Sequence, residues 1–560
     1  MKIFSTTLPY IFLILVINIF LQLFKIEGDY KRKIKHLCKG LINNTHCYIS
    51  IICGICFSTF TVIGNLKIFD KYGWLGVIVS FIIWFVLYQQ MFIALVQITD
   101  TIMVYNKYEY KDYIKWGIGT FIVLCVIDGI FLLVFYPGSM YYDTFVQMCQ
   151  ATGGSAYSNH HAWLHTLMMK FTYELGLLIF NNSNKAYATF IICNIMLISS
   201  AFSFMIMWLR KKGMKTIPLI IVYLMIVLSP INQMFSINGY KDVPFAAFVI
   251  YWVLLLSNIL DDLNAEKNIL IWKWCLFILL SFLVCYSRTN GYYMFLGMIP
   301  ILVIALRKKI KSIITAIIFV LILGVIYKGP IFTYFEVKEP DIIESLSIPA
   351  QQIAAVYYYD GVVHKEQNAL LEEIVDTSRL KEEYGSSPTC SDNIKNLVRE
   401  KNSQQIIREK ADIFLKLWVE LFWENKRIYV KAYVNQTSGY WYHHVKSPFL
   451  WATYIEPNGM GIERDSKVPE NIEKAFRQYL KVSEDFFDIF LSVGLYMYIF
   501  LFSMFIAWKK KNKYILLFIP FLGIWGTLLI ATPVYADIRY AYAIYAVVPF
   551  LMSIAFMKRR

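Results

Sequence analysis

Long apolar segments recur along almost the whole chain, and they limit its fold more than any other feature. A helix that crosses the hydrocarbon core of a bilayer needs about 17–25 predominantly apolar residues, and about thirteen segments have that length. They are residues 8–24, 47–66, 74–98, 115–136, 185–208, 217–235, 243–260, 268–287, 290–306, 311–328, 485–508, 513–531 and 538–556. Hydrophobic residues make up 58% of the chain, which excludes an ordinary soluble domain. The sequence therefore predicts an all-α integral membrane protein with about 13 transmembrane helices.

Clusters of Lys and Arg between these segments indicate how the chain crosses the membrane, because cytoplasmic loops are enriched in both residues. The clusters begin at Lys31, Lys107, Arg210, Arg307, Lys509 and Lys558. All of them lie on the cytoplasmic side only if residues 162–180 do not cross, so we expect this segment to be an amphipathic helix on the outer surface. The formal charge of +15 is interpreted as a topology signal, and no nucleic-acid partner is expected.

This orientation divides the chain into four parts. Residues 1–114 hold extra N-terminal transmembrane helices, and residues 115–328 form a transmembrane core with a first outer loop at 136–184. Residues 329–484 form an extracytoplasmic insert, and residues 485–560 hold the C-terminal transmembrane helices. The insert is polar with helix-like spacing, so we expect it to be mainly helical.

The insert also contains segments that suggest contacts outside its own core. Residues 411–434 set large aromatics beside charges, which is typical of a helix at a membrane surface. Residues 345–361 and 435–449 combine aromatic rings with Gln351, Gln352, His443 and His444. The rings would stack on sugars and the polar groups would bind hydroxyls, although ordinary packing explains most of them more simply.

A lone carboxylate, Asp143, lies about two helical turns beyond the membrane edge. Pro137 and Gly138 end the preceding helix and turn the chain. At the mouth of a membrane cavity, Asp143 would act as a general base or would orient an acceptor hydroxyl. Because it precedes an apolar helical pattern, a plain helix-capping role fits the sequence equally well.

Three histidines follow, at positions 160, 161 and 165. If this segment is helical, His161 and His165 lie on one face, a spacing that suits a metal or a phosphate. No nearby Cys or second carboxylate completes a metal site. Contacts with phosphate or sugar therefore stay open, beside simple contacts with lipid headgroups.

Three other outer turns pair a cation with polar residues. The pairs are Lys241 with Asp242, Arg288 with Asn290, and Arg539 with Asp537. Each cation alone is explained as an anchor at the membrane boundary. Together they lie on the side where cations are disfavoured, which predicts a shared anionic ligand. The phosphate of a lipid would reach that depth, and Arg suits bidentate phosphate binding.

The order of these features resembles the GT-C superfamily, membrane glycosyltransferases that use a lipid-linked sugar donor. The segments that carry the resemblance are YPGSMYYDTFVQ (136–147), SNHHAWLHTLMMKFTYELG (158–176), NGYKDVPF (238–245), SRTNG (287–291) and DIRYAYAIY (537–545). The chain also looks like a group of uncharacterised bacterial multi-span proteins. The resemblance therefore implies a GT-C-like fold in a bacterial cell membrane, with the active site on the extracytoplasmic face.

The resemblance implies transfer of a sugar from a polyprenyl-phosphate donor to a glycan, lipid or protein acceptor, with inversion. Asp143 would be the catalytic carboxylate, and the donor phosphate would be held by Lys241, Arg288 and Arg539. The candidate substrate-binding residues are His160, His161, His165, Asp242, Asn290, Tyr292, Gln351 and His443. A divalent metal, Mg²⁺ or Mn²⁺, held by Asp143 stays open, although no D-x-D pair is present. Ala162 also stands where similar segments often have a proline.

Two alternative functions stay open. A flippase or transporter of a lipid-linked glycan predicts ionisable residues at mid-span, such as Asp128, and broken central helices. A polysaccharide polymerase or ligase would use similar outer arginines and histidines. Because most charges lie at the outer edges, the sequence favours an enzyme over a transporter, but it separates the glycosyltransferase poorly from a polymerase or ligase.

Overall fold

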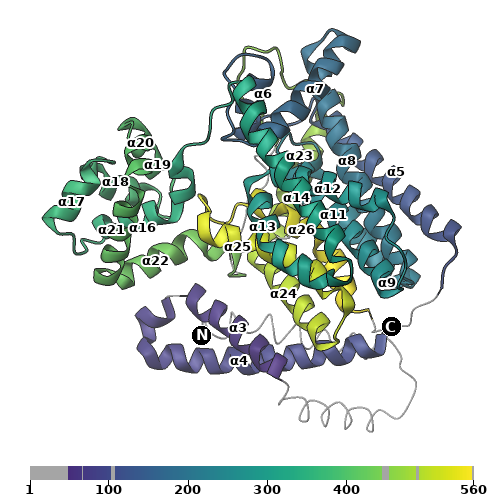
Figure 1. Cartoon of the computed structure of the whole chain (residues 1–560), viewed down its shortest axis with the longest axis horizontal. Coiled ribbons are helices and arrows are strands. Elements are labelled where there is room, and N and C mark those ends of the chain that lie inside the picture. Colours follow the sequence, from purple (N-terminus) through teal and green to yellow (C-terminus); the bar gives the residue numbers. More distant parts are fainter. Residues whose placement is uncertain are drawn as a thin grey trace. The chain divides into compact units, whose positions relative to one another are not determined.

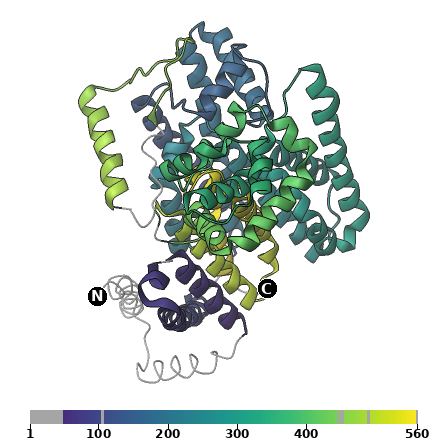
Figure 2. The same ribbon diagram turned by 90° about the vertical axis from the view of Figure 1, so that its left-hand side faces the viewer.

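The computed structural model describes residues 48–65, 67–102, 107–443, 445, 453–486 and 491–557 (Figure 1, Figure 2). The predicted span 8–24 and His444 lie outside these residues. Contacts divide the chain into two units, Met1–Met103 with Trp508–Lys510 and Arg560, and Val104–Ala507 with Lys511–Arg559. In the described ranges the secondary structure is helical, and β-structure is limited to isolated bridges. The prediction of an α-helical protein is therefore confirmed for these ranges.

The first unit contains α3 (Tyr48–Gly64) and α4 (Lys67–Ile102). Gly54 lets the two helices approach closely, since a Cβ there would meet the Phe85 ring at 2.9 Å. The Thr61 and Tyr88 hydroxyls are hydrogen-bonded at 2.9 Å between the helices. Within α4, Gly73 has a φ of 60°, a backbone conformation that glycine adopts freely.

Apolar helices form the core of the second unit. They are α5 (Tyr110–Val134), α8 (Ser183–Lys211), α9 (Thr216–Val227), α10 (Pro230–Ser236), α11 (Asp242–Asn264), α12 (Ile271–Ser287), α13 (Thr289–Ala305), α14 (Ile310–Ile326), α24 (Val493–Lys509), α25 (Ile519–Ala531) and α26 (Ile538–Ala555). The most apolar windows of α11 and α26 are 89% and 83% buried, against 39% for α5. Helices that are apolar all round belong in the interior, so α11 and α26 form the centre (Figure 1).

Seven helices among the described residues are long and apolar enough to cross a membrane. They are Lys71–Gln97, Tyr110–Val134, Ser183–Lys211, Asp242–Asn264, Arg307–Tyr334, Lys513–Ala531 and Ile538–Ala555. The pair α9 and α10, bent by 51°, would make eight if it counts as one span. The apolar helices α3, α12, α13 and α24 are shorter, with 17 residues each. A multi-span membrane protein is supported, and the figure of about 13 spans stays a prediction.

The two ends of α11 differ in charge. At its C-terminal end, Asp261 pairs with Lys212, and it lies 3.2 Å from the Lys513 amine and 2.6 Å from the Tyr514 hydroxyl. Basic residues from two predicted cytoplasmic loops therefore meet acidic partners on one side, because Arg210 also pairs with Asp112 there. The N-terminal end of α11, about 35 Å away, begins at Asp242.

Two further helices follow α5. They are α6 (Asp143–Ala151) and α7 (Trp163–Phe180), and α7 is not among the seven candidate spans. One side of α7 packs on α8, where Gly176 allows close approach to Ala186. The other side exposes large apolar residues, including Phe171 at 70% and Leu178 at 83%. This exposed surface suits the predicted position at a membrane surface.

The insert is a body of short helices. They are η3 (Ile342–Leu346), α16 (Ser347–Tyr358), α17 (Lys365–Glu372), η4 (Thr377–Arg379), α18 (Leu380–Ser386), α19 (Asp392–Glu400), α20 (Gln404–Glu409), α21 (Ala411–Glu424), α22 (Lys426–Thr437) and η5 (Ser438–Tyr440). The remaining elements outside the insert body are η1 (Arg307–Lys309), η2 (Tyr327–Ile331), α15 (Phe332–Tyr334), α23 (Glu470–Phe486) and η8 (Lys513–Phe518). Buried apolar residues of η3, α16, α18 and α19 share one core cluster.

Residues 411–434, predicted as one surface helix, are two helices that part at Asn425. The Asn425 side chain accepts from the Val362 N–H and donates to the Val362 carbonyl, both at 2.8 Å. This pairing holds Asn425 out of helical register, and no local pattern in the sequence signals it. The prediction of a single helix was therefore wrong, although Leu415, Val419 and Trp423 do expose an apolar stripe on α21.

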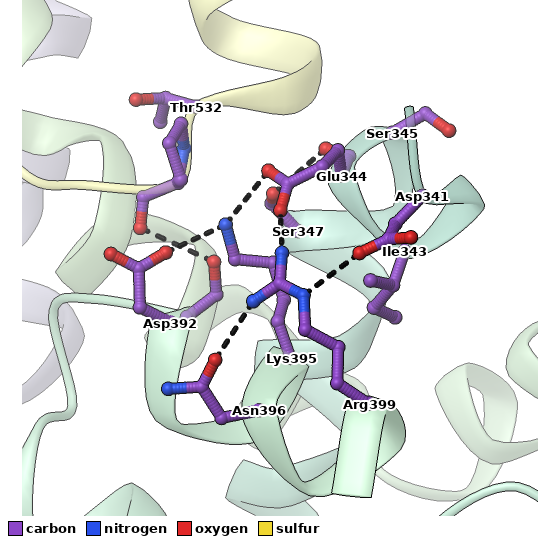
Figure 3. A network of polar contacts seen from close by, with 12 residues as sticks. Asp341, Ile343, Glu344, Ser345, Ser347, Asp392, Lys395, Asn396, Arg399 and Thr532 are labelled. Carbon is purple, nitrogen blue, oxygen red and sulfur yellow. Dashed lines mark hydrogen bonds and ion pairs between the residues drawn. The ribbon is translucent and has the colours of Figure 1, made fainter. Parts of the chain in front are cut away.

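The insert also holds the loop that leads into α26. Gln436 donates to the Thr532 carbonyl at 2.8 Å, and the Ser391 N–H donates to the Pro533 carbonyl at 2.9 Å. Close to this loop, Lys395 joins Glu344 at 2.9 Å and Asp392 at 2.6 Å (Figure 3). These charges order the edge of the insert that meets the loop.

Candidate functional site

Charged side chains from five separate segments meet at the N-terminal end of α11. They are Asp143 at the start of α6, His161 before α7, Lys241 and Asp242 at the start of α11, Arg288 between α12 and α13, and Asp537 and Arg539 at the start of α26. The sequence singled out these turns separately, and the fold brings them together.

Asp143, Lys241 and His161 form the central contact of the site. The Lys241 Nζ lies 2.6 Å from the Asp143 Oδ2 and 3.2 Å from the His161 Nδ1. The His161 Nδ1 is 3.6 Å from the same Asp143 oxygen. The Lys241 amine donates to the carboxylate and to the imidazole, so the contact requires a lone pair on His161 Nδ1.

Arg539 approaches Asp143 from the other side. Its NH1 lies 3.8 Å from the Asp143 Oδ1. The same guanidinium is held by Asp537, which accepts from the Arg539 Nε at 2.8 Å and lies 2.7 Å from its NH2. Asp143 is therefore placed between a lysine and an arginine.

Arg288 forms a second layer behind these residues. It pairs with Asp242 and donates to the Arg539 carbonyl at 3.2 Å. Its guanidinium also lies over the Tyr540 ring, 4.9 Å from the centroid. Arg288 thus joins α11, α12 and α26 at one point.

The charges of the site balance. Three carboxylates, Asp143, Asp242 and Asp537, face three cations, Lys241, Arg288 and Arg539. An anionic ligand would therefore compete with a carboxylate for each cation. Asp143 is the most exposed of the six, with 22% of its side chain accessible against 4–11% for the others. Asp143 is thus the charged group of this set most open to a ligand.

Burial and charge shift the titration of these groups. Burial alone would raise the pKa of Asp143, but attraction to Lys241, His161 and Arg539 outweighs it and holds this pKa well below its usual range. Burial and the nearby Lys241 lower the pKa of His161 well below its usual range. At neutral pH the site therefore holds an ionised Asp143 and a neutral His161.

Backbone conformation is unusual directly before two of the carboxylates. Tyr142 has a φ of 44° and Ala536 has a φ of 56°, and they precede Asp143 and Asp537. Side chains other than glycine rarely adopt positive φ, and such strain gathers at functional sites. At the second position Gly439 packs so tightly on Ala536 that a Cβ would lie 2.5 Å from it.

Arg464 fixes the turn that precedes Asp143. Its NH1 donates to the carbonyls of Phe135 and Gly138, the latter at 3.1 Å, and its NH2 donates to the Thr453 carbonyl. Burial lowers the pKa of Arg464 to about 10, so it stays charged at neutral pH. Alongside, the Met140 N–H donates to the Tyr454 carbonyl at 3.0 Å. No pattern in the sequence singles out Arg464, which shares its polar loop with Lys467.

Two tyrosines that the sequence analysis did not single out lie against Arg539. The Arg539 guanidinium lies over the Tyr240 ring at 4.9 Å and over the Tyr540 ring at 5.4 Å. The Tyr240 hydroxyl is buried and has no hydrogen-bond partner among the described residues. Both tyrosines directly neighbour predicted cations, and that adjacency is the signal that could have found them.

Two of the predicted histidines lie apart from the central contact. His160 is exposed, with its ring 4.5 Å from the ring of His161. His165 is fully buried, and its Nδ1 is hydrogen-bonded to the Gln147 Oε1 at 3.0 Å. Because α7 begins at Trp163, His161 lies in the preceding loop, so the condition that this segment is helical is not met and His161 and His165 do not share a helix face.

Four other predicted residues have structural partners elsewhere. Asn290 donates to Thr527 at 2.6 Å, and the ring of Tyr292 packs 6.2 Å from the ring of Tyr286. In the insert, Gln351 donates to the Ser387 carbonyl at 2.9 Å. The ring of His443 lies 5.1 Å from the ring of Tyr498. None of these contacts involves Asp143, Lys241 or Arg539.

The side chains around Asp143 decide whether a divalent metal fits this site. Among the described residues, no group of three His, Cys, Asp or Glu side chains is arranged to hold a metal ion. The nearest groups to the Asp143 oxygens are a lysine, an arginine and a histidine. This cationic surrounding does not fit Mg²⁺ or Mn²⁺, which prefer several oxygen ligands.

The apolar helices and the charged cluster at the end of α11 define an α-helical multi-span membrane protein with a polar site at one end of its bundle. The chain belongs to a family described as "Family of unknown function (DUF6020)", whose model matches residues 151–560. Asp143 precedes the matched range, whereas His161, Lys241, Arg288 and Arg539 lie inside it. No curated protein and no solved structure matches the chain.

Proposed function

We propose that this protein is a GT-C-type glycosyltransferase that moves a sugar from a polyprenyl-phosphate donor to an acceptor on the outer face of a bacterial cell membrane. The observation that carries the proposal is the position of Asp143, an accessible carboxylate flanked by Lys241 at 2.6 Å and Arg539 at 3.8 Å. Cations beside a carboxylate suit a reaction in which a hydroxyl nucleophile displaces a phosphate leaving group.

In the proposed reaction, the acceptor hydroxyl attacks the anomeric carbon of the sugar, and the bond from that carbon to the phosphate oxygen breaks. Polyprenyl phosphate leaves with the bonding electron pair, and Asp143 takes the hydroxyl proton. The charge that develops on the phosphate would be stabilised by Lys241 and Arg539, with Arg288 supporting the latter through its carbonyl.

The low pKa of Asp143 implies that the donor must bind before Asp143 can accept the proton. While Lys241 and Arg539 hold the carboxylate, it is a weak proton acceptor. A donor phosphate that draws these cations away would raise the pKa of Asp143 and free its oxygens. The carboxylate would thus become an effective base only when the donor is bound.

A membrane-surface location suits a lipid-linked donor. Helix α7 begins two residues after His161, and the exposed apolar residues of its C-terminal half include Leu178 at 83% and Ile179 at 60%. A helix of this kind lies at the boundary between headgroups and acyl chains. The phosphate of a lipid donor at that boundary would be level with the charged cluster.

The test is sugar transfer from polyprenyl-phosphate sugars by the purified protein in nanodiscs. Asp143→Asn should lower the transfer rate by about 10²- to 10⁴-fold, since it removes the base and keeps the shape. Asp360→Asn is the matched control, because Asp360 also lies 2.6 Å from a lysine amine but is 77% exposed in the insert. Equal transfer by wild type and a folded Asp143→Asn would refute the role of this carboxylate.

A transporter or flippase of a lipid-linked glycan is the second candidate, and two observations favour it. The span formed by α9 and α10 is broken by 51°, and Asp128 is buried in α5 beside it, with its Oδ2 3.4 Å from the Ser199 hydroxyl. Broken helices beside an intramembrane carboxylate are typical of transporters. However, the Asn232 and Gln233 side chains donate to the Ile226 and Val227 carbonyls. The carbonyls freed by the break are therefore hydrogen-bonded within the protein and do not need a transported ligand.

One variant separates the two candidates. Asp128→Asn should abolish movement of a fluorescent lipid-linked glycan across proteoliposomes if the protein is a transporter. It should leave sugar transfer within about twofold of wild type if the protein is a transferase, because Asp128 is not in contact with the charged cluster. A polymerase or ligase would use the same cluster, and it would be recognised by a glycan rather than a single sugar in the product.

A further inference from the structure

We propose that the insert binds a single hydrocarbon chain of a membrane lipid in an apolar cavity between η3, α16 and α21. The cavity has a volume of about 180 Å³, and its lining includes Leu346, Ala350, Ile353, Phe414, Leu415 and Trp418. This inference goes beyond the proposed transferase activity, and it does not depend on that activity.

The lining identifies the chemistry of the ligand. Every residue that lines the cavity is apolar or a proline, and the indole N–H of Trp418 is the polar side-chain group among them. This N–H already donates to the Gln352 side-chain oxygen at 3.0 Å. A sugar, a phosphate or a peptide backbone would lose its hydrogen bonds there. Apolar cavities of roughly 150 Å³ stay dry and take up hydrocarbon guests.

The cavity is open to the surface on one side. Leu346, Ala350, Ile353 and Phe414 at its lining are only half-buried, and Leu415 is 60% exposed. On the opposite side, Leu371, Val375 and Leu417 are buried and close it. The shape is therefore a blind pocket, which suits the end of a chain rather than a helix or a flat surface.

The exposed stripe on α21 indicates where the chain comes from. Leu415, Val419 and Trp423 are spaced four residues apart, so they lie on one face of the helix, and Trp423 is 63% exposed. Leu415 belongs both to this stripe and to the cavity lining. In a multi-span membrane protein, such a stripe suits contact with lipid, and a chain that leaves the lipid surface would reach the cavity along it.

The experiment uses the full-length protein in nanodiscs with a fatty acid that carries a diazirine at its chain end, and with an isoprenoid alcohol carrying the same group. After irradiation, mass spectrometry should find the label on peptides that contain residues 342–353 and 411–418. Labelling by either probe supports the hydrocarbon pocket, and the stronger label identifies an acyl or an isoprenoid source. Absence of label from these peptides with both probes would overturn the proposal.

Three variants make the result specific. Ala350→Phe fills the cavity and should reduce labelling of these peptides at least tenfold, while labelling of the exposed face of α7 stays constant. Val419→Phe, on the stripe but outside the lining, is the matched control and should have no such effect. Ile353→Ala enlarges the cavity and should increase labelling, which guards against a fold defect in Ala350→Phe. Unchanged labelling in Ala350→Phe and Ile353→Ala would overturn the proposal.

A competition series measures the size of the pocket. Unlabelled fatty acids of increasing length should compete with about fourfold higher affinity for each added methylene until the cavity is filled. Beyond that length, the affinity should level off. An affinity that rises without limit would indicate partition into lipid instead of a pocket and would overturn the proposal.

Discussion

The Lys241 Nζ lies 2.6 Å from the Asp143 Oδ2, although the two residues are 98 positions apart in the chain. Lys241 directly precedes the most buried helix of the bundle, and Asp143 begins a short helix above it. Through this contact, a residue anchored in the core lowers the pKa of the accessible carboxylate.

Lys241→Met should make Asp143 titrate at a higher pH. Burial raises the pKa of Asp143 and Lys241 is the strongest opposing influence, so removal of Lys241 should raise this pKa. The acidic limb of log(kcat/KM) against pH would then shift to higher pH. Lys381→Met, which removes the exposed partner of Asp360, should leave the limb in place. Coincident limbs for Lys241→Met and wild type would contradict this assignment.

The same contact links stability to pH. Because the pKa of Asp143 is depressed in the folded protein, its stabilising contribution is present above the unfolded value of about 3.9 and is lost as the pH falls through the folded value. Asp143→Asn should therefore flatten the decline of thermal stability below pH 4. A decline as steep as in wild type would show that other groups dominate it.

Arg288→Met should destabilise the protein by about 3–5 kcal/mol, because it leaves Asp242 buried without its cation. The double variant Arg288→Met with Asp242→Leu should recover most of this loss. Thermal unfolding in detergent measures both. Arg379→Met removes a cation from two exposed ion pairs and should cost no more than about 1 kcal/mol. Additive losses in the double variant would show that Arg288 and Asp242 are not coupled.

His165→Gln should reduce the loss of stability between pH 7 and pH 5. Burial and Lys241 lower the pKa of His165 to about 3, so the folded protein keeps it neutral while the unfolded chain protonates near 6.5. Wild type should lose about 1.4 kcal/mol per pH unit between these two values from this residue alone. The comparison variant is His364→Gln, since His364 is 63% exposed. Parallel stability curves for wild type and His165→Gln would refute the prediction.

Arg464→Met should lower kcat more than it raises KM, because it loosens the turn that positions Asp143. It should also cost about 2–4 kcal/mol of stability, since several carbonyls lose their donor. Steady-state kinetics and thermal unfolding measure the two effects. Arg408→Met removes a donor from a single exposed carbonyl and serves as the control. Unchanged kcat would assign Arg464 to stability alone.

The helices could be predicted from the sequence because they depend on local hydrophobicity. Each predicted apolar segment within the described residues coincides with an apolar helix. Bends within the helices were harder to predict from the sequence. Segment 217–235 is bent between Leu228 and Pro230, because proline does not continue the first helix, and the Asn232 and Gln233 side chains donate to the carbonyls that the bend leaves unpaired. The sequence shows the two amide side chains within an apolar segment, but it does not show which backbone carbonyls they bind.

The sequence indicated which turns carry the charged residues of the site, but it did not indicate how these residues contact one another. Lys241, Arg288 and Arg539 stood out because cations are disfavoured on the outer side. Their pairing with Asp143, Asp242 and Asp537 depends on contacts across the fold, which a local pattern does not encode. The strained Tyr142 and Ala536 are ordinary residues whose φ angles are set by tertiary packing.

Hydrogen bonds from the insert hold the loop before α26 in this chain. The Ser391 hydroxyl donates to the Pro533 carbonyl across 142 positions of sequence, and Tyr440 donates to the neighbouring Val534 carbonyl at 2.8 Å. Asp537 and Arg539 follow this loop within a few residues. A chimera that replaced the insert alone would therefore lose the anchors of its own last helix. We therefore expect the insert and the C-terminal helices to be exchangeable only together, despite the long stretch of chain between them.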